Sequence, residues 1–390
     1  MEEQYLTLLI CLFIFILHIF IHNFLIPNLF LVSIFLTISF VYVIYKTTWK
    51  SNRKLAFILV FFLVCFLAVA NHKKFGLKDK YFRLSQITIF EPSESNALNY
   101  NIFFTETNTS RELLSLKQMC SIESAALNNP NANVFLYSLR ANIYPELLDK
   151  YKNIRLVFTN PETIYNNTDL FDWWLRKKND ILNSDYWIHD LSDTFRIALL
   201  YKYGGYYSDL DTITVRSIES LLDLNGVGYI TEIGKPSIGN GILVFQKNHS
   251  FLSEAISDVI NNYKKSEWGY NGPRLFMRTL KSYCRTQDIY RDLMHDDLKK
   301  RGNPSQKCDV GIFPENFFYP INWENVNKMF MKNGLMEIKL FMEAYSVHFY
   351  GKFSQNIPVH MKDYSIFEYF AFKNCPYIFS ILDKNIISSF

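Results

Sequence analysis

Three long apolar runs occupy the first 70 residues, and they constrain the fold of this chain more than any other feature. Residues 6–26 form an uncharged run of 21, residues 29–45 continue it after Pro27-Asn28, and residues 55–70 form a third run. A run of about 20 apolar residues can cross a bilayer as a helix, and a soluble core helix rarely stays apolar on every face for so long. We therefore expect residues 1–70 to be a membrane anchor, with either one span or three.

Charge and glycosylation patterns predict which side of the membrane the rest of the chain faces. The opening Met-Glu-Glu-Gln carries no positive charge, which argues against a cleaved signal peptide. The basic cluster at residues 46–54 favours a cytosolic loop there and a luminal chain after residue 70, although three lysines between residues 73 and 78 weaken that bias. N-glycosylation sequons at Asn108, Asn166 and Asn248 all follow the last apolar run and favour the lumen.

Four cysteines lie outside the apolar runs: Cys120, Cys284, Cys308 and Cys375. An even number without C-x-x-C spacing suits two disulfides in an oxidising compartment, and the sequence leaves their pairing open. Four buried free thiols are the alternative.

The remaining sequence divides into a short stem and one large domain. Residues 71–98 are polar and without periodicity, which predicts the stem. Residues 99–390 contain strand-like segments at 102–105, 134–138 and 154–158 that alternate with helical segments such as 113–127. This order predicts an α/β fold with a mainly parallel sheet covered by helices. Ligands of such sheets bind beyond the carboxyl ends of the strands, and Thr105 lies at one such end.

Residues 191–221 carry the pattern with most chemical content, LSDTFRIALLYKYGGYYSDLDTITVRSIESL. Ser192 or Asp193 is expected to cap a helix that ends at the Gly-Gly pair at 204–205, and a strand beginning at residue 206 is expected to end in Asp209-Leu210-Asp211. A spacing of two on an extended chain places both carboxylates on one face, where they repel each other unless a cation lies between them. Such oxygen ligands suit Mn²⁺ or Mg²⁺, which can also bind a diphosphate.

The acid pair has three other interpretations. An ordinary acidic surface turn is the simplest alternative. An EF-hand calcium loop fails, because Ile213 stands at a ligand position and Thr214 at the required glycine. A phosphatase pair DxDx[TV] is nearly matched by DLDTI, but that motif belongs at the end of the first strand of its domain.

The stretch SDTFRIALLYKYGGYYSDLDTI resembles the signature S-D-x-x-R-x-x-x-L-x-x-x-G-G-x-Y-x-D-x-D of a family that includes α1,4-galactosyltransferases and α1,4-N-acetylglucosaminyltransferases. Tyr207 departs from it, since Ile or Val is usual there. The similarity extends over residues 101–375 and includes all four cysteines, NGILVFQKNH, WGYNGPRLFMRTLKSYC, CDVGIFPENFFYPINW and AYSVHFYGKFSQ. The membrane region does not share it, because family members usually have a single short anchor. The resemblance implies a GT-A catalytic domain over residues 99–390, a nucleotide-diphospho-sugar transferase with a Rossmann-like mixed sheet.

The resemblance also implies roles for single residues. Asp211 would bind Mn²⁺ or Mg²⁺ directly, Asp209 would contact the ribose or reach the metal through water, and His348 would be a further metal ligand. The metal would neutralise charge on the departing UDP. The expected donor-binding residues are Thr105, Ser192, Asp193, Arg196, Gly205, Tyr206, Asn240 and Gly241.

Trp268, Gly272 and Pro273 are expected to bind the acceptor, with Trp268 stacking on a sugar. The sequence offers no unambiguous nucleophile, and Glu267 is the candidate catalytic carboxylate. Structural roles remain open for several of these positions: a structural histidine, an Asp193–Arg196 ion pair within one helix, and a packing tryptophan.

The function implied is a retaining transfer of galactose or GalNAc from its UDP donor, in α1,4 linkage, to a glycolipid such as lactosylceramide, by an enzyme of the Golgi membrane with its catalytic domain in the lumen. The alternatives are a UDP-GlcNAc-dependent α1,4 transferase acting on glycoproteins, or a non-catalytic, membrane-tethered glycan-binding protein. The near balance of 41 Lys+Arg against 37 Asp+Glu gives no basic surface for nucleic acid.

Overall fold

The computed structural model describes residues 100–294 and 308–384, all within one compact unit, Lys80–Phe390. The three apolar runs predicted to span a membrane and the predicted stem at 71–98 lie outside the described residues. Within the two described ranges, no helix has both the length and the apolar character that a membrane crossing requires.

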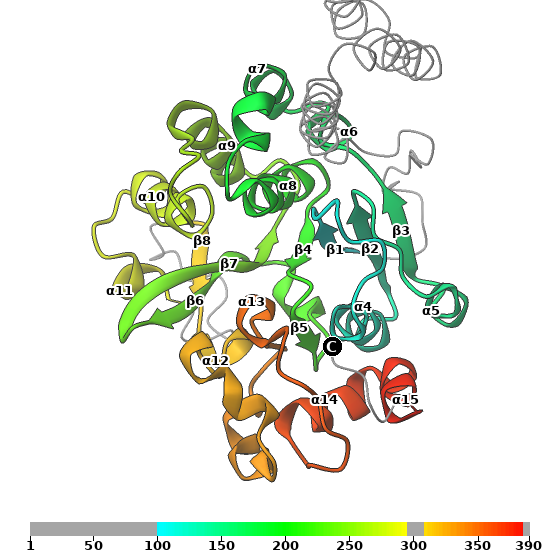
Figure 1. The fold of residues 1–390 in the computed structure, drawn as a ribbon. Coiled ribbons are helices and arrows are strands. Elements are labelled where there is room, and N and C mark those ends of the chain that lie inside the picture. Colours follow the sequence, from blue (N-terminus) through cyan, green and yellow to red (C-terminus); the bar gives the residue numbers. More distant parts are fainter. Residues whose placement is uncertain (1–99, 295–307, 385–390) are drawn as a thin grey trace, which may run out of the picture. The chain divides into compact units, whose positions relative to one another are not determined.

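A seven-stranded mixed sheet forms the centre of this unit, with the order β3-β2-β1-β4-β7-β6-β8 (Figure 1). Strands β1 to β4 run parallel, as predicted, whereas β7 runs antiparallel to both β4 and β6. A second, two-stranded sheet pairs β5 with β9. The strands are β1 (Tyr100–Glu106), β2 (Ala132–Ser138), β3 (Ile154–Phe158), β4 (Gly205–Ser208), β5 (Thr212–Thr214), β6 (Asn225–Glu232), β7 (Lys235–Phe245), β8 (Val310–Phe313) and β9 (Ser346–His348).

Helices cover both faces of the sheet and bury two separate apolar clusters. Along β1, Ile102 and Phe104 belong to one cluster and Phe103 to the other, as the alternation of a strand requires. The α-helices are α4 (Leu116–Asn128), α5 (Pro145–Lys150), α6 (Pro161–Tyr165), α7 (Leu170–Leu182), α8 (Trp187–Tyr203), α9 (Ser250–Asn262), α10 (Pro273–Tyr283), α11 (Ile289–Leu293), α12 (Glu315–Phe318), α13 (Gly351–Ser354), α14 (Ile366–Asn374) and α15 (Pro376–Lys384); the 3₁₀ helices are η2 (Glu219–Leu221), η3 (Trp323–Phe330) and η4 (Gly334–Phe341).

Two predicted helix starts are corrected by the structure. The helix expected from residue 113 begins at Leu116, because Ser115 and Gln118 form a capping box at that point. Neither Ser192 nor Asp193 caps a helix, since both lie inside α8, which begins at Trp187. Their side chains instead serve the polar network described below.

Helix α8 ends at Gly204, as predicted, and the next residue enters β4 at once. Gly204 and Gly205 both have positive φ, of 64° and 119°. A side chain on Gly205 would lie 2.4 Å from the carbonyl oxygen of Asn101 on β1. Glycine is therefore needed for the tight turn that inserts β4 beside β1.

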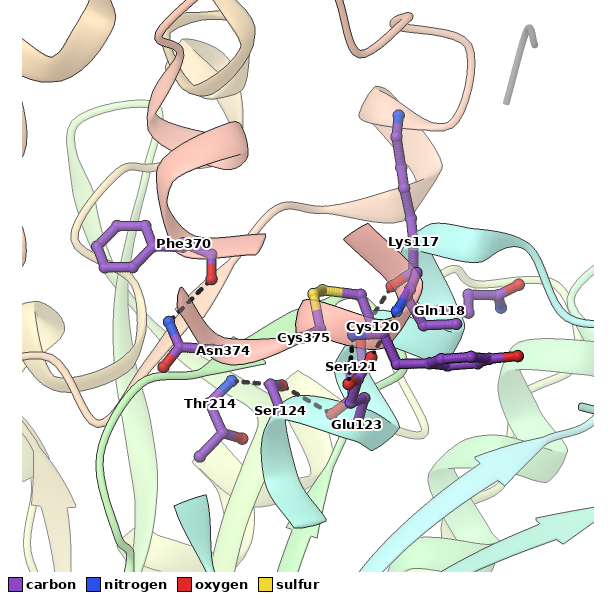
Figure 2. Close-up of a disulfide and its surroundings, with 12 residues drawn as sticks. Lys117, Gln118, Cys120, Ser121, Glu123, Ser124, Thr214, Phe370, Asn374 and Cys375 are labelled. Carbon is purple, nitrogen blue, oxygen red and sulfur yellow. Dashed lines mark hydrogen bonds between the residues drawn. A yellow bond between two sulfur atoms is a disulfide. The ribbon is translucent and has the colours of Figure 1, made fainter. Parts of the chain in front are cut away.

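The predicted disulfides are confirmed, and the structure assigns their pairing as Cys120–Cys375 and Cys284–Cys308. Figure 2 shows the first bond, which joins α4 to the end of α14. The second bond joins residues only 24 apart, whereas the first joins residues 255 apart. The first therefore ties the beginning of the described domain to its end.

Helix α4 also holds the backbone between the two acids and after them, and Figure 2 shows its contact with Thr214. The Ser121 hydroxyl donates to the carbonyl oxygen of Leu210 at 2.8 Å, and the Ser124 hydroxyl accepts from the Thr214 N–H at 2.9 Å. These two contacts fix the turn between β4 and β5 against a buried helix.

The same helix holds two segments near the end of the chain. Lys117 Nζ donates to the carbonyl oxygens of Ser354 and Ile357 at 2.8 and 2.7 Å. The Glu123 carboxylate accepts from the N–H of Ile378 at 2.8 Å, in the first turn of α15, where the helix dipole favours a negative charge. Helix α4 thus connects the acid turn to the C-terminal segments.

Candidate active site

The acid pair lies on a turn and not on an extended strand. Strand β4 ends at Ser208, and residues 209–211 turn before β5 begins at Thr212, so the predicted strand geometry is wrong. The hydroxyls of Ser208 and Thr212 share a hydrogen bond of 2.8 Å across the turn, which closes it. Leu210 is buried, and the carboxylates of Asp209 and Asp211 still converge because the turn folds them together.

His348 completes a cluster with the two acids. Strand β9 pairs with β5 so that His348 lies opposite Thr212, directly after the acid turn. One ligand atom from each of Asp209, Asp211 and His348 lies within 4.8 Å of the others. His348 Nε2 is 3.1 Å from Asp211 Oδ1, and the Gly351 N–H donates to Asp211 Oδ2 at 2.6 Å. The predicted metal-binding side chains are therefore brought together.

A buried arginine organises the other acid. Arg196 on α8 is 4 % exposed, and its guanidinium lies 3.2 Å from both Asp193 Oδ1 and Asp209 Oδ1. The Tyr207 hydroxyl donates to Asp209 Oδ1 at 2.9 Å, and the Arg196 guanidinium lies over the Tyr207 ring. Because Arg196 is shared between two carboxylates, it fixes the position of Asp209 relative to α8.

Five predicted donor-binding residues belong to this one network: Thr105, Ser192, Asp193, Arg196 and Asn240. The Thr105 and Ser192 hydroxyls contact each other at 3.3 Å, and the Asn240 amide donates to Asp193 Oδ1 at 2.8 Å. Their convergence at the ends of β1 and β4 agrees with the place where open α/β sheets bind ligands. Their role in donor binding stays a prediction.

The remaining predicted donor residues lie in different surroundings. Asn240 and Gly241 lie inside β7. Gly241 borders the acid cluster, because a side chain there would lie 2.7 Å from Asp209 Oδ2. Gly205 serves the turn after α8, and Tyr206 is buried in an apolar cluster with 1 % exposure, so the donor-binding role of both residues stays a prediction.

The two carboxyl groups differ in their electrostatics. Burial raises the pKa of Asp209 to about 6, although the Arg196 guanidinium opposes this shift. Burial acts in the same direction on Asp211, but His348 and the Gly351 N–H outweigh it and lower the pKa of Asp211. Burial tends to lower the pKa of His348, and the Asp211 carboxylate outweighs it, so the net shift is upward. Asp211 is the acid that stays ionised to lower pH.

The cluster offers suitable ligands for a divalent cation of the Mn²⁺ or Mg²⁺ type, since both acids present carboxylate oxygens. The histidine fits less directly. Its Nδ1 accepts from the Tyr350 N–H at 3.2 Å, so the neutral ring carries its proton on Nε2, the atom that faces Asp211. Metal binding through Nε2 would move the ring proton to Nδ1 and break the hydrogen bond from the Tyr350 N–H. The carboxylates are therefore the principal ligands.

The predicted acceptor residues lie on a surface turn between α9 and α10. Trp268 is 45 % exposed. The residue that follows Gly351, Lys352, places its Nζ 4.8 Å from the centre of the Trp268 ring. Gly272 and Pro273 begin α10, and Gly272 packs closely against the Asp193 carboxylate. The turn therefore lies beside both ends of the polar network, and its acceptor role stays a prediction.

Glu267 makes its polar contacts at the surface. It pairs with Lys264 at 2.8 Å and with Arg274 at 3.4 Å, and the Lys264 hydrogen bond lowers its pKa. Among the described residues, none of its ion pairs reaches the acid cluster. Its catalytic role stays a prediction that this geometry does not favour.

Asn166 and Asn248 are exposed, whereas Asn108 is half-buried and its side-chain oxygen accepts from the Ser110 N–H and hydroxyl. All three sequons are thus at least partly at the surface, and their glycosylation stays a prediction.

Sequence reasoning missed two tyrosines of the site, Tyr207 and Tyr319. Tyr207 was noted only as a departure from the family signature, and Tyr319 stands in an aromatic stretch that resembles core. The Tyr319 ring lies 5.2 Å from the His348 ring. A polar atom on an otherwise core-like aromatic was the only signal that the sequence offered.

Comparisons with known proteins agree with this site. Residues 115–227 match the glycosyltransferase sugar-binding region containing a DXD motif, and residues 244–382 match the alpha 1,4-glycosyltransferase conserved region. Human lactosylceramide 4-alpha-galactosyltransferase is 27 % identical over 287 residues, which cover 71 % of this chain and 75 % of that protein. The rat protein of the same name is 28 % identical, with 71 % and 74 % coverage.

Two further similarities are weaker. Human alpha-1,4-N-acetylglucosaminyltransferase is 29 % identical over 236 residues, covering 57 % of this chain and 63 % of that protein. The crystal structure of the galactosyltransferase LgtC with donor and acceptor sugar analogues aligns with a TM-score of 0.38 at 15 % identity, covering 71 % of this chain and 95 % of that one.

The mixed α/β sheet, the acid cluster and the two matched regions together define a DXD-containing hexosyltransferase. Within that class, the chain is similar to the α1,4-glycosyltransferases lactosylceramide 4-alpha-galactosyltransferase and alpha-1,4-N-acetylglucosaminyltransferase, as the sequence resemblance predicted.

Proposed function

We propose that this protein is a metal-dependent, retaining GT-A glycosyltransferase that transfers galactose, or GalNAc, from its UDP donor in α1,4 linkage to a glycolipid such as lactosylceramide. The single observation that carries the proposal is the convergence of Asp209, Asp211 and His348 within 4.8 Å beside the network of Arg196. A lone acidic turn at a surface would need neither the buried arginine nor the histidine.

A divalent metal, when bound, supplies a Lewis acid that neutralises the charge of the diphosphate leaving group. Asp211 would be its main protein ligand, since the Gly351 N–H fixes one carboxylate oxygen and leaves the other facing the cluster. Asp209 would be held by Arg196 and Tyr207 to contact the ribose or a metal-bound water. Arg196 itself is committed to two carboxylates, and it acts by orienting Asp209.

The glycolipid acceptor and the galactose donor rest on the relatives' names and on the predicted membrane anchor. We place the enzyme at the Golgi membrane with residues 99–390 in the lumen as part of the same proposal. An acceptor embedded in a membrane is reached most easily by a domain tethered to that membrane, and a sugar can stack on the exposed Trp268 ring.

The direct test offers the full-length protein, in detergent, a panel of UDP-sugars with lactosylceramide and other glycolipids. We expect transfer from UDP-galactose that needs Mn²⁺ and an α1,4 bond in the product. Asp211→Asn should abolish transfer while leaving the fold intact. The matched control is Asp149→Asn, the same change of charge on α5 at a side chain 84 % exposed. Full transfer by Asp211→Asn, or full transfer after chelation of metal, would contradict the proposal.

A second candidate is a UDP-GlcNAc-dependent α1,4 transferase acting on glycoproteins, which the similarity to alpha-1,4-N-acetylglucosaminyltransferase supports. The same panel separates the two, because UDP-galactose and UDP-GlcNAc differ in the group at C2 and in the configuration at C4 of the sugar. Failure to release UDP from any donor would instead favour a glycan-binding protein without catalysis.

A further inference from the structure

Tyr319, at the end of α12, lies in a slot that glycines make on the sheet. It is 2 % exposed, and its ring crosses β6 and β7 at Gly228 and Gly239, which are paired in register. A side chain on Gly228 would lie 2.5 Å from the ring carbon Cε2, and one on Gly239 would lie 2.9 Å from the phenolic oxygen. Any larger residue at either position would displace the ring, so the two glycines leave space for an aromatic side chain.

The hydroxyl end of this ring points to the acid cluster. A side chain on Gly241 would lie 3.3 Å from Tyr319 Oη, 2.7 Å from Asp209 Oδ2 and 3.2 Å from His348 Nε2. The phenol, the carboxylate and the imidazole therefore border the same small region beside one glycine. Packing against the His348 ring, tilted by 39° with its centre 5.2 Å away, holds the phenol in this direction.

The hydroxyl is buried and has no hydrogen-bond partner among the described residues. Leaving a buried donor unpaired costs about 1–3 kcal/mol, and most such groups in folded proteins are paired. A phenylalanine would fill the glycine slot without that cost. A tyrosine whose hydroxyl does nothing for the fold, and which points to the cluster that holds a ligand, is best explained by a contact to that ligand.

We propose that Tyr319 is a ligand-binding residue of this site, whose hydroxyl donates a hydrogen bond to an anionic oxygen of a nucleoside diphosphate held at the acid cluster. The phenol is protonated at neutral pH and donates one hydrogen bond, which suits a phosphate oxygen. The inference rests on the proposed function, because it takes the nucleotide to be the ligand of the cluster.

Tyr319→Phe tests this directly, since it removes the oxygen and keeps the ring in its slot. The full-length protein is titrated with UDP in the presence of Mn²⁺ by calorimetry, and its thermal unfolding is measured without ligand. We expect UDP affinity to fall at least about tenfold, because hydrogen bonds to charged groups contribute more than neutral ones. We expect the unfolding temperature without ligand to stay the same or to rise.

Tyr345→Phe is the matched control. The Tyr345 hydroxyl contacts the Ser220 hydroxyl at 3.1 Å, so its removal should lower the unfolding temperature and leave UDP affinity unchanged. Equal UDP affinity in Tyr319→Phe and wild type would overturn the inference, as would a lower unfolding temperature of Tyr319→Phe without ligand. A wild-type protein that binds no UDP with Mn²⁺ would instead overturn the proposed function together with it.

The glycine slot gives an independent check. Gly239→Ala should displace the phenol and weaken UDP binding in the wild-type background. In the Tyr319→Phe background it should add little further loss, because the hydroxyl is already absent. Fully additive losses would show that the slot acts on binding by another route and would overturn the inference.

Discussion

Gly272→Ala is a small change with a large expected effect, because the new methyl group has no room. A side chain at position 272 would lie 2.3 Å from Asp193 Oδ2 and 2.6 Å from Asp193 Cγ, well inside van der Waals contact. The carboxylate must move, and it then loses the Asn240 amide at 2.8 Å and the Arg196 guanidinium at 3.2 Å. The side chains of Asp193 and Arg196 are 11 % and 5 % exposed, so water does not replace these partners freely.

The expected loss of stability depends on the ion pair that Arg196 retains. Removing one partner of a buried ion pair costs about 3–5 kcal/mol, but Arg196 retains Asp209 at 3.2 Å, so we expect a smaller cost of about 2–3 kcal/mol. For a domain of this size that corresponds to a fall in unfolding temperature of about 4 °C or more. Because the displaced carboxylate no longer shares Arg196, Asp209 should also shift, and KM for the UDP-sugar should rise.

The assay compares thermal unfolding and KM of Gly272→Ala with those of Gly334→Ala. Position 334 is the control because a side chain there would come no closer than 3.3 Å to its neighbours, and its backbone does not have positive φ. The reasoning is refuted if both variants are equally stable with the same KM, since Asp193 would then move without loss. It is also refuted if KM is unchanged while stability falls, because the Asp193 contact would then serve the fold alone.

Three further outcomes are expected. Burial raises the pKa of Asp190 from 3.8 to about 6, so ionisation of this carboxyl is disfavoured in the folded state. The free energy of unfolding should therefore fall by on the order of 3 kcal/mol as pH rises from about 4 to about 6. Asp190→Asn should lose this slope in denaturant titrations across that range, and an unchanged slope would be contrary. The Cys120–Cys375 bond closes a loop of 255 residues, whereas the Cys284–Cys308 bond closes one of 24. Chain entropy therefore predicts that replacing Cys120 and Cys375 by serine costs about 2 kcal/mol more stability than the same change at Cys284 and Cys308. Equal melting temperatures of the two double variants would contradict this. In a secretory cell, Asn→Gln at the exposed Asn166 and Asn248 should each remove one step of glycosidase-sensitive gel shift, and a chain without any N-glycan would argue against luminal placement.

Local sequence features predicted the parts of the fold that depend on neighbouring residues. The end of α8 followed from Gly204-Gly205, and the strands at 134–138 and 154–158 followed from short apolar runs. The antiparallel course of β7 was not predicted, because strand direction depends on pairing with β4 and β6 far along the chain. Periodicity carries no information on such long-range partners.

The candidate site was predicted better in composition than in geometry. Asp209, Asp211 and His348 converge although the acids were placed on a strand and lie on a turn. Tyr206 was predicted to bind the donor, whereas it is Tyr207, on the other face of the strand, that contacts Asp209. The buried hydrogen bonds that decide such choices come from distant segments and are visible only in the structure.

The bond between Cys120 and Cys375 places a condition on synthesis. Residue 375 must be synthesised before the disulfide to α4 can form. By then every other described element except α15 has been made. A chain that stops just short of this point still contains both aspartates and His348, yet leaves an unpaired thiol on the helix that steadies the turn between them. A nonsense mutation shortly before residue 375 would therefore act on an acid pair encoded more than a hundred positions upstream.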